Sequence, residues 1–163
     1  MTTAGLPPTL VLGLGNPVLG DDGIGCRVAQ ALGGAAEDLE AEIDTCEKGG
    51  LSLMERMLGY RRVILIDALT TGEGPRGRVT TMQLGDLRNP GAGHVNSGHE
   101  ASLQTALEMA RLLKAVVPEE IWVVAIETER VFDLTEDLTP EVAAALPHAV
   151  AAVRTLLAEN PTT

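Results

Sequence analysis

Residues 10–28 read LVLGLGNPVLGDDGIGCRV, and the rest of the chain can be interpreted from this segment. An apolar run ending at Leu14 leads into a loop rich in glycine, asparagine and proline, and an apolar segment with helical spacing follows. This order predicts a strand, a turn and a helix. Asp21 and Asp22 stand where the helix begins. We expect Asp21 to cap the helix and Asp22 to remain available as a ligand.

The glycines of this loop do not form a dinucleotide site. That fingerprint requires Gly-x-Gly-x-x-Gly, and here Val18 stands where the third glycine would follow Gly13 and Gly15. The two aspartates would also repel a pyrophosphate. The loop is therefore better suited to a cation.

Length and composition predict one globular domain, residues 1–163. The chain is 45% apolar and 21% charged, with a net charge of −11, which argues against a nucleic-acid partner. Apolar runs such as 121–126 are far shorter than the roughly 20 residues that span a bilayer. Cys26 and Cys46 lack a metal-type spacing and are interpreted as reduced thiols. We expect a cytoplasmic protein with no membrane partner.

Strand-like and helix-like segments alternate along the chain. Expected strands after the first are 41–46, 62–67, 78–84 and 119–126, and expected helices are 22–32, 51–58, one from about residue 97 and one from Thr139 and Pro140. Pro147 predicts a kink or a restart in the last helix. The alternation predicts a doubly wound, three-layer α/β/α domain.

Three polar residues are expected to converge in such a fold. Asp22 follows the first strand, Asp67 ends the third, and His99 lies in the first turn of a helix that a Ser-x-x-Glu capping box introduces. Ligands of doubly wound sheets bind beyond the carboxyl ends of the strands, where the winding reverses. Two carboxylates and an imidazole suit a divalent ion such as nickel or zinc.

Other interpretations of these residues remain open. Asp67 could simply form a turn, and a single histidine such as His99 is often an ordinary surface residue. His94 is a rival ligand in a glycine-containing loop. Structural and functional roles are equally plausible for Glu127 and Glu129 at the end of the fifth strand.

The motifs GLGNPVLGDDGIG, LIDAL and SGHEASL, with a late DLTPEV, resemble those of the hydrogenase maturation proteases over essentially the whole chain. The resemblance implies an aspartyl-type endopeptidase that removes the carboxyl-terminal extension of a nickel-iron hydrogenase large-subunit precursor after nickel insertion. The family's catalytic and metal-binding residues map onto Asp22, Asp67 and His99. The nickel would belong to the precursor, and other divalent metals could occupy the same residues.

The resemblance also implies a fold. It is a twisted, mostly parallel five-stranded sheet of order 2-1-3-5-4, with the fourth strand antiparallel, as in phosphorylase/hydrolase-like proteins. The chain departs from its relatives at Cys46 and Glu47, before Gly49 and Gly50, where relatives often have an aspartate. This difference bears on how the substrate docks.

Two other functions stay open at this stage. One is a non-catalytic nickel-binding chaperone for hydrogenase assembly, because ligand residues alone do not establish turnover. The other is a peptidyl-tRNA hydrolase-like enzyme, since GLGNP also opens those proteins. Such enzymes need basic residues and a histidine soon after the loop, whereas Asp21 and Asp22 follow here.

Overall fold

The computed structural model describes residues 9–34, 38–86, 98–129 and 133–159, with only the backbone for 98–102. Its strands form one five-stranded sheet of order β2-β1-β3-β5-β4. They are β1 (Thr9–Leu14), β2 (Ala41–Cys46), β3 (Arg62–Leu69), β4 (Val79–Gln83) and β5 (Glu120–Glu127). β4 is antiparallel to β5, and the other pairs are parallel. The predicted strand order and direction are confirmed.

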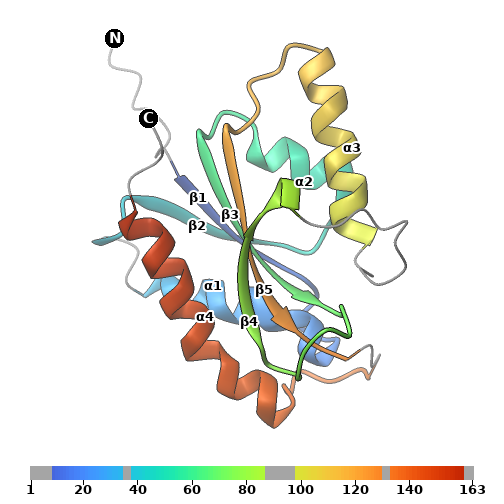
Figure 1. Ribbon diagram of the computed structural model, residues 1–163, viewed down its shortest axis with the longest axis vertical. Helices are drawn as coiled ribbons and strands as arrows, with labels where there is room; N and C mark the ends of the chain where they lie inside the picture. The colour runs from blue at the N-terminus through green and yellow to red at the C-terminus, as the bar shows by residue number, and fades with distance from the viewer. Residues whose placement is uncertain (1–8, 35–37, 87–97, 130–132, 160–163) are drawn as a thin grey trace.

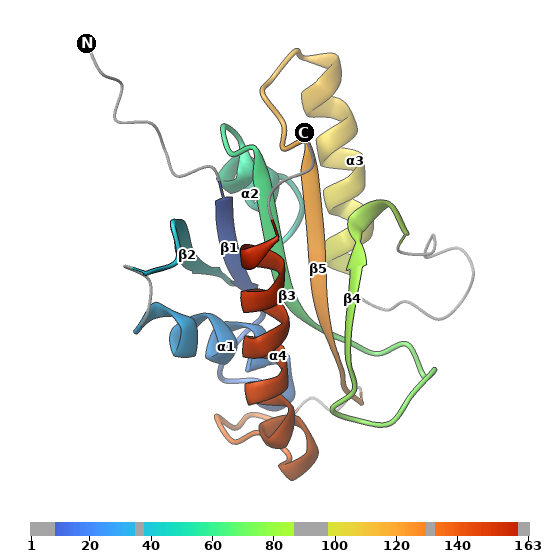
Figure 2. The same ribbon diagram turned by 60° about the vertical axis from the view of Figure 1, so that its left-hand side comes forward.

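Helices cover both faces of the sheet (Figures 1 and 2). α2 (Gly50–Met57) and α3 (Gly98–Leu112) pack on one face, and α1 (Ile24–Gly33) and α4 (Pro140–Ala158) pack on the other. Within the described residues, the short 3-10 helices η1 (Gly20–Gly23) and η3 (Leu84–Asp86) lie between the larger elements. The predicted three-layer architecture is confirmed.

Strand β3 shows why the sheet needs helices on both sides. Val63, Leu65 and Leu69 pack toward α2 and α3, whereas Ile64 and Ile66 pack toward α1 and α4. Successive strand residues point to opposite faces, so a strand covered on both sides reads as a continuous apolar run. The same alternation assigns Asp67 to the face that α2 and α3 cover.

α1 approaches the sheet so closely that only glycine fits at the contact. A Cβ atom on Gly25 would lie 2.2 Å from the Ile66 carbonyl oxygen and 2.4 Å from that of Leu14. A Cβ on Gly13 would lie 2.3 Å from the Gly25 carbonyl oxygen. The start of α1 therefore rests directly on the ends of β1 and β3.

α4 is held at its carboxyl end by a buried arginine at the start of β3. Arg62 donates from Nη1 to the carbonyl oxygens of Leu156, at 2.7 Å, and Glu159, at 3.0 Å. A cation at this position satisfies the free carbonyls of the last turn and interacts favourably with the helix dipole. Glu120 pairs with the same guanidinium at 3.0 Å.

Several predicted details of the helices and strands differ from the structure. β3 continues to Leu69, so Asp67 does not end it, and the first helix begins with the 3-10 turn η1. Thr139 is the N-cap of α4 and Pro140 is its first residue, as expected, but the helix runs through Pro147 without a restart. By length and composition alone α4 could cross a membrane; its buried side chains pack on the sheet.

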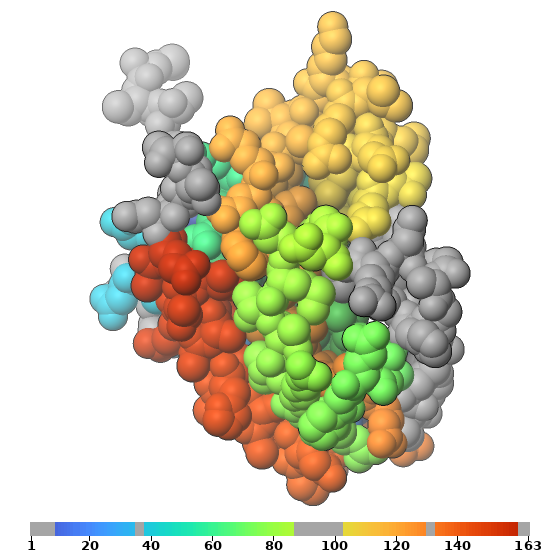
Figure 3. Space-filling model, viewed as in Figure 1, coloured from blue at the N-terminus to red at the C-terminus, as the bar shows by residue number. Residues whose placement is uncertain are grey.

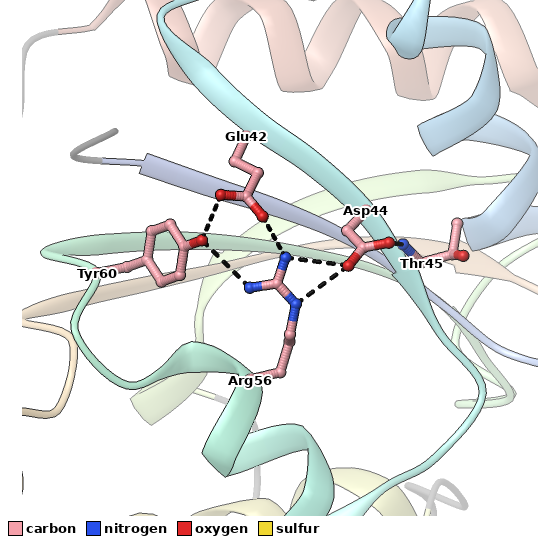
Figure 4. Close-up of polar contacts among 5 residues, drawn as sticks. All are labelled: Glu42, Asp44, Thr45, Arg56 and Tyr60. Atoms are coloured by element: carbon pink, nitrogen blue, oxygen red, sulfur yellow. Dashed lines mark hydrogen bonds and ion pairs between the residues drawn. The ribbon is translucent and has the colours of Figure 1, made fainter. Parts of the chain in front are cut away.

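A polar network joins α2 to the edge strand β2 (Figure 4). The Arg56 guanidinium lies between Glu42 and Asp44, and it donates from Nε to Asp44 Oδ2 at 3.1 Å. Tyr60 donates its hydroxyl hydrogen to Glu42. Two hydrogen bonds lower the pKa of Glu42: the one from Tyr60 has the larger effect, and the one from Arg56 the smaller. The network connects the carboxyl-terminal end of α2 to β2, the strand that leads to the Cys46–Gly50 loop.

Replacement of Gly25 by alanine tests the contact between α1 and the sheet. We expect Gly25→Ala to lower the free energy of unfolding by about 3 kcal/mol, because backbone atoms that cannot rotate away occupy the Cβ position. Urea denaturation measures this change. Gly33→Ala is the matched control, since nothing lies within 4 Å of its Cβ position, and it should leave stability unchanged or slightly raised. Equal stabilities of the two variants would contradict the interpretation.

Arg56→Met tests the polar network through its pH dependence. We expect a loss of about 1 kcal/mol at pH 7, since the charges are partly exposed and solvent screens them. The lowered pKa of Glu42 means that this stabilisation is present above the ordinary carboxyl pKa and is lost as the pH falls through the folded-state value. Thermal unfolding from pH 7 to pH 3 should therefore show the wild type and the variant converging. A constant difference would exclude the contribution of Glu42.

Candidate functional site

Asp67 is a buried carboxylate near the end of β3. Its side chain is only 2% exposed, and the residue pairs with Ala125 on β5. Leu65 and Leu69, two residues before and after it on the same face of β3, belong to the apolar layer that α2 and α3 cover. A buried carboxylate has a large desolvation cost, so its presence here needs a functional or structural reason.

Asp22 reaches the same edge of the sheet from the loop between β1 and α1. The loop folds back on it: the backbone N–H of Asn16 donates to Asp22 Oδ2 at 2.8 Å. Gly15 has φ +115°, and a Cβ there would lie 1.9 Å from the carbonyl oxygen of Asp22. The glycine and asparagine of the loop are therefore what allow the backbone to wrap around this carboxylate.

Asp21 does not cap the first helix, and that prediction is wrong. Its two oxygens accept hydrogen bonds from the backbone N–H and the hydroxyl of Thr139, both at 2.8 Å. The N-cap residues of η1 and α1 are Leu19 and Gly23, and neither makes a side-chain cap. Asp21 instead fastens the loop to the start of α4, across a sequence separation of 118 residues that no local pattern reveals.

The buried thiol of Cys26 lies near several carboxylates. Its thiol is buried and donates to the Gly15 carbonyl oxygen at 3.3 Å. Burial, and then the negative charges of Glu47, Asp22 and Asp67 in that order, raise the pKa of Cys26 to about 11. Asp22 and Asp67 are thus near the same buried thiol. Cys26 stays protonated at neutral pH, so it is not a thiolate nucleophile.

The structure places the backbone of His99 but not the predicted three-residue set. α3 begins at Gly98, so His99 lies in its first turn, and Leu103 one turn later is fully buried against the sheet. The side chain of His99, the capping serine Ser97 and the rival ligand His94 lie outside the described residues. Among the side chains that are described, no three His, Cys, Asp or Glu residues are grouped to hold a metal. The set Asp22, Asp67 and His99 stays a prediction.

Glu127 and Glu129 both have structural partners. Glu127 accepts from the backbone N–H groups of Thr71 and Gly72, each at 2.9 Å, and from the Thr71 hydroxyl at 2.7 Å. Glu129 pairs with Arg76. These contacts hold the loop between β3 and β4 against the end of β5, which favours the structural interpretation.

A cavity of about 560 Å³ lies at the opposite end of the sheet, where the parallel strands begin. Arg61, Glu119 and Ile121 line it together with Gln104 and Arg111 of α3. The cavity is therefore at the start of β3 and β5, whereas Asp67 is near the end of β3. The candidate site is defined by its carboxylates and not by the size of a cavity.

The family model "Hydrogenase maturation protease" matches residues 8–156 of the chain. The chain belongs to this family. It is accordingly a peptidase that acts in hydrogenase maturation. The site described above lies in the loop and strand segments that this match spans.

Solved structures of hydrogenase maturation proteases share the fold. The hydrogenase maturating endopeptidase HybD from Escherichia coli superposes with a TM-score of 0.71 at 25% identity, over 92% of this chain and 91% of that one. HybD from Thermococcus kodakarensis, a [NiFe] hydrogenase maturation protease, gives 0.70 at 24% identity, over 91% and 98%. The hydrogenase 2 maturation peptidase from Thaumarchaeota archaeon SCGC_AB-539-E09 gives 0.61 at 28% identity, over 91% and 97%. No curated protein matches the sequence.

Thiol alkylation tests the environment of Cys26. Under native conditions at pH 8 we expect iodoacetamide to modify the half-buried Cys46 and to leave Cys26 unmodified, because Cys26 is buried and its pKa is about 11. Peptide mass spectrometry identifies the modified residue. In denaturant both thiols should react, which is the control. Equal native rates would contradict the buried, protonated state of Cys26.

Proposed function

We propose that the protein removes the carboxyl-terminal extension of a nickel-iron hydrogenase large-subunit precursor after nickel has been inserted. Membership of the hydrogenase maturation protease family supports the reaction class. The observation that supports the site most directly is the shared influence of Asp22 and Asp67 on the buried Cys26 thiol. We also propose that the protein acts in the cytoplasm, where the precursor would be assembled.

The proposed role of Asp22, Asp67 and His99 is to recognise the nickel that the precursor carries. Carboxylate oxygens and imidazole nitrogen are suitable donors for nickel and for other divalent first-row metals. Asp22 comes from a loop held by Asn16, while Asp67 comes from a rigid central strand. Donors on such different supports can approach an ion from two sides. The precursor would thereby be bound with its metal-bearing segment against the ends of β1 and β3.

We infer that peptide-bond cleavage is of the aspartyl type. A carboxylate at this edge would orient the attacking water and accept its proton, which is the usual work of an aspartate in hydrolysis. Cys26 is excluded as a nucleophile by its protonated state. Asp67 is only 2% exposed, and a carboxylate shielded from bulk water interacts more strongly with a substrate cation.

The test is cleavage of a cognate precursor, followed by intact mass. We expect loss of a carboxyl-terminal peptide only from the nickel-loaded precursor. Asp67→Asn and His99→Gln should abolish processing while their unfolding midpoints stay near that of the wild type. Asp86→Asn and His148→Gln, at exposed positions on η3 and α4, are the matched controls and should process normally. Full processing by both site variants would refute the assignment, and nickel binding without any cleavage would favour a nickel carrier.

A further inference from the structure

Two exposed aliphatic side chains stand beside the candidate site. Val18 is 42% exposed and Leu134 is 84% exposed, although most large apolar side chains of the described chain are buried. Val18 belongs to the same loop as Asp22. Leu134 lies in the segment that leads to α4. We call Val18 and Leu134 the rim pair.

Backbone hydrogen bonds hold the rim pair in register. Leu19 and Thr135 form a parallel bridge, the Thr135 N–H donates to the Val18 carbonyl at 3.0 Å, and the Gly20 N–H donates to the Thr135 carbonyl at 2.7 Å. Val18 and Leu134 each immediately precede a residue of this bridge, so the backbone segments that carry them lie side by side. The two bonds from Thr139 to Asp21 fasten the same segments a second time. The rim pair is therefore displayed on a rigid support.

Acidic residues predominate in the two segments that carry the rim pair. Asp133, Glu136 and Asp137 flank Leu134, and Asp21 and Asp22 follow Val18. A basic residue, Arg27 of α1, is also nearby, and its guanidinium donates to the Glu136 carbonyl oxygen at 2.7 Å. A partner for this surface must bring apolar side chains and positive charge, because an acidic segment would be repelled.

We propose that the rim pair docks an extended segment of the substrate polypeptide in which aliphatic side chains stand next to lysine or arginine. This inference rests on the proposed function, since the loop that displays Val18 also supplies Asp22 to the site. The distance along the loop is only four residues, so a chain seated on the rim pair continues directly toward Asp22. The surface thus selects the polypeptide around the cleaved bond, whereas the carboxylates select the metal.

The molecule offers a matched control for this surface. Leu112, in the last turn of α3, is 82% exposed, almost the same as Leu134. It lies toward the edge where the parallel strands begin, and Figure 3 shows α3 at one end of the molecule and the start of α4 at the other. A serine at either position removes an equally exposed leucine from the surface.

The experiment measures kcat and KM for processing of the nickel-loaded precursor at several salt concentrations. Leu134→Ser and Val18→Ser should each raise KM, by about tenfold for the leucine, with little change in kcat, and Leu112→Ser should match the wild type. The KM of the wild type should rise with salt, because screening weakens attraction between opposite charges. Equal KM values for Leu134→Ser and Leu112→Ser would overturn the proposal.

Binding separates this proposal from the proposed function. The dissociation constant of the precursor is measured for two proteins, the Asp67→Asn variant and the double variant Asp67→Asn, Leu134→Ser. Both carry Asp67→Asn so that the precursor is not cleaved during the measurement. Tighter binding when Leu134 is present supports the docking surface even if the wild type fails to cleave, which would refute only the proposed function. Equal dissociation constants for the two variants would contradict the docking proposal and would leave the proposed cleavage reaction unaffected.

Discussion

The close approach of Gly13 and Gly25 is the constraint on which the rest of the structure depends. Because neither residue has a Cβ, the start of α1 rests on the carbonyl groups at the ends of β1 and β3. The preceding loop is then forced to turn sharply, and Gly15 permits it at a positive φ. Asp22 is placed over the end of β3 as a result. A larger side chain at any of these glycines would move the carboxylate away from Asp67.

Strand parity supplies the second part of the site. β3 is buried on both faces, so each of its residues belongs to one helix layer or the other. Asp67 falls on the layer of α2 and α3. His99 lies in the first turn of α3, so it belongs to the same layer. A shift of one residue in β3 would have turned the carboxylate toward α1 and α4. The fold thus places an acid and the first turn of α3 on one side of the sheet.

The sequence predicts the three layers and the loop that carries Asp22, because glycine spacing and apolar runs are local signals. The motif resemblance supplies the strand order. The sequence does not predict the partner of Asp21, because Thr139 is remote from it along the chain. A threonine at a helix N-cap does not by itself indicate that an acidic side chain will bind it. The end of β3 is also missed, because an aspartate inside a strand resembles an aspartate that ends one. The roles of Glu127 and Cys26 follow only from tertiary neighbours.

The clustering of carboxylates has an energetic consequence for the proposed reaction. The negative charges of Glu47, Asp22 and Asp67 all raise the pKa of the Cys26 thiol, so these like charges lie near one another. A divalent ion carried by the substrate lowers this repulsion, whereas a substrate without the ion leaves it in place. Under the proposed function, the same acids would therefore favour the metal-loaded substrate over the empty one. If the proposed function holds, charge alone would already favour a loaded precursor, before any contact with the polypeptide is made.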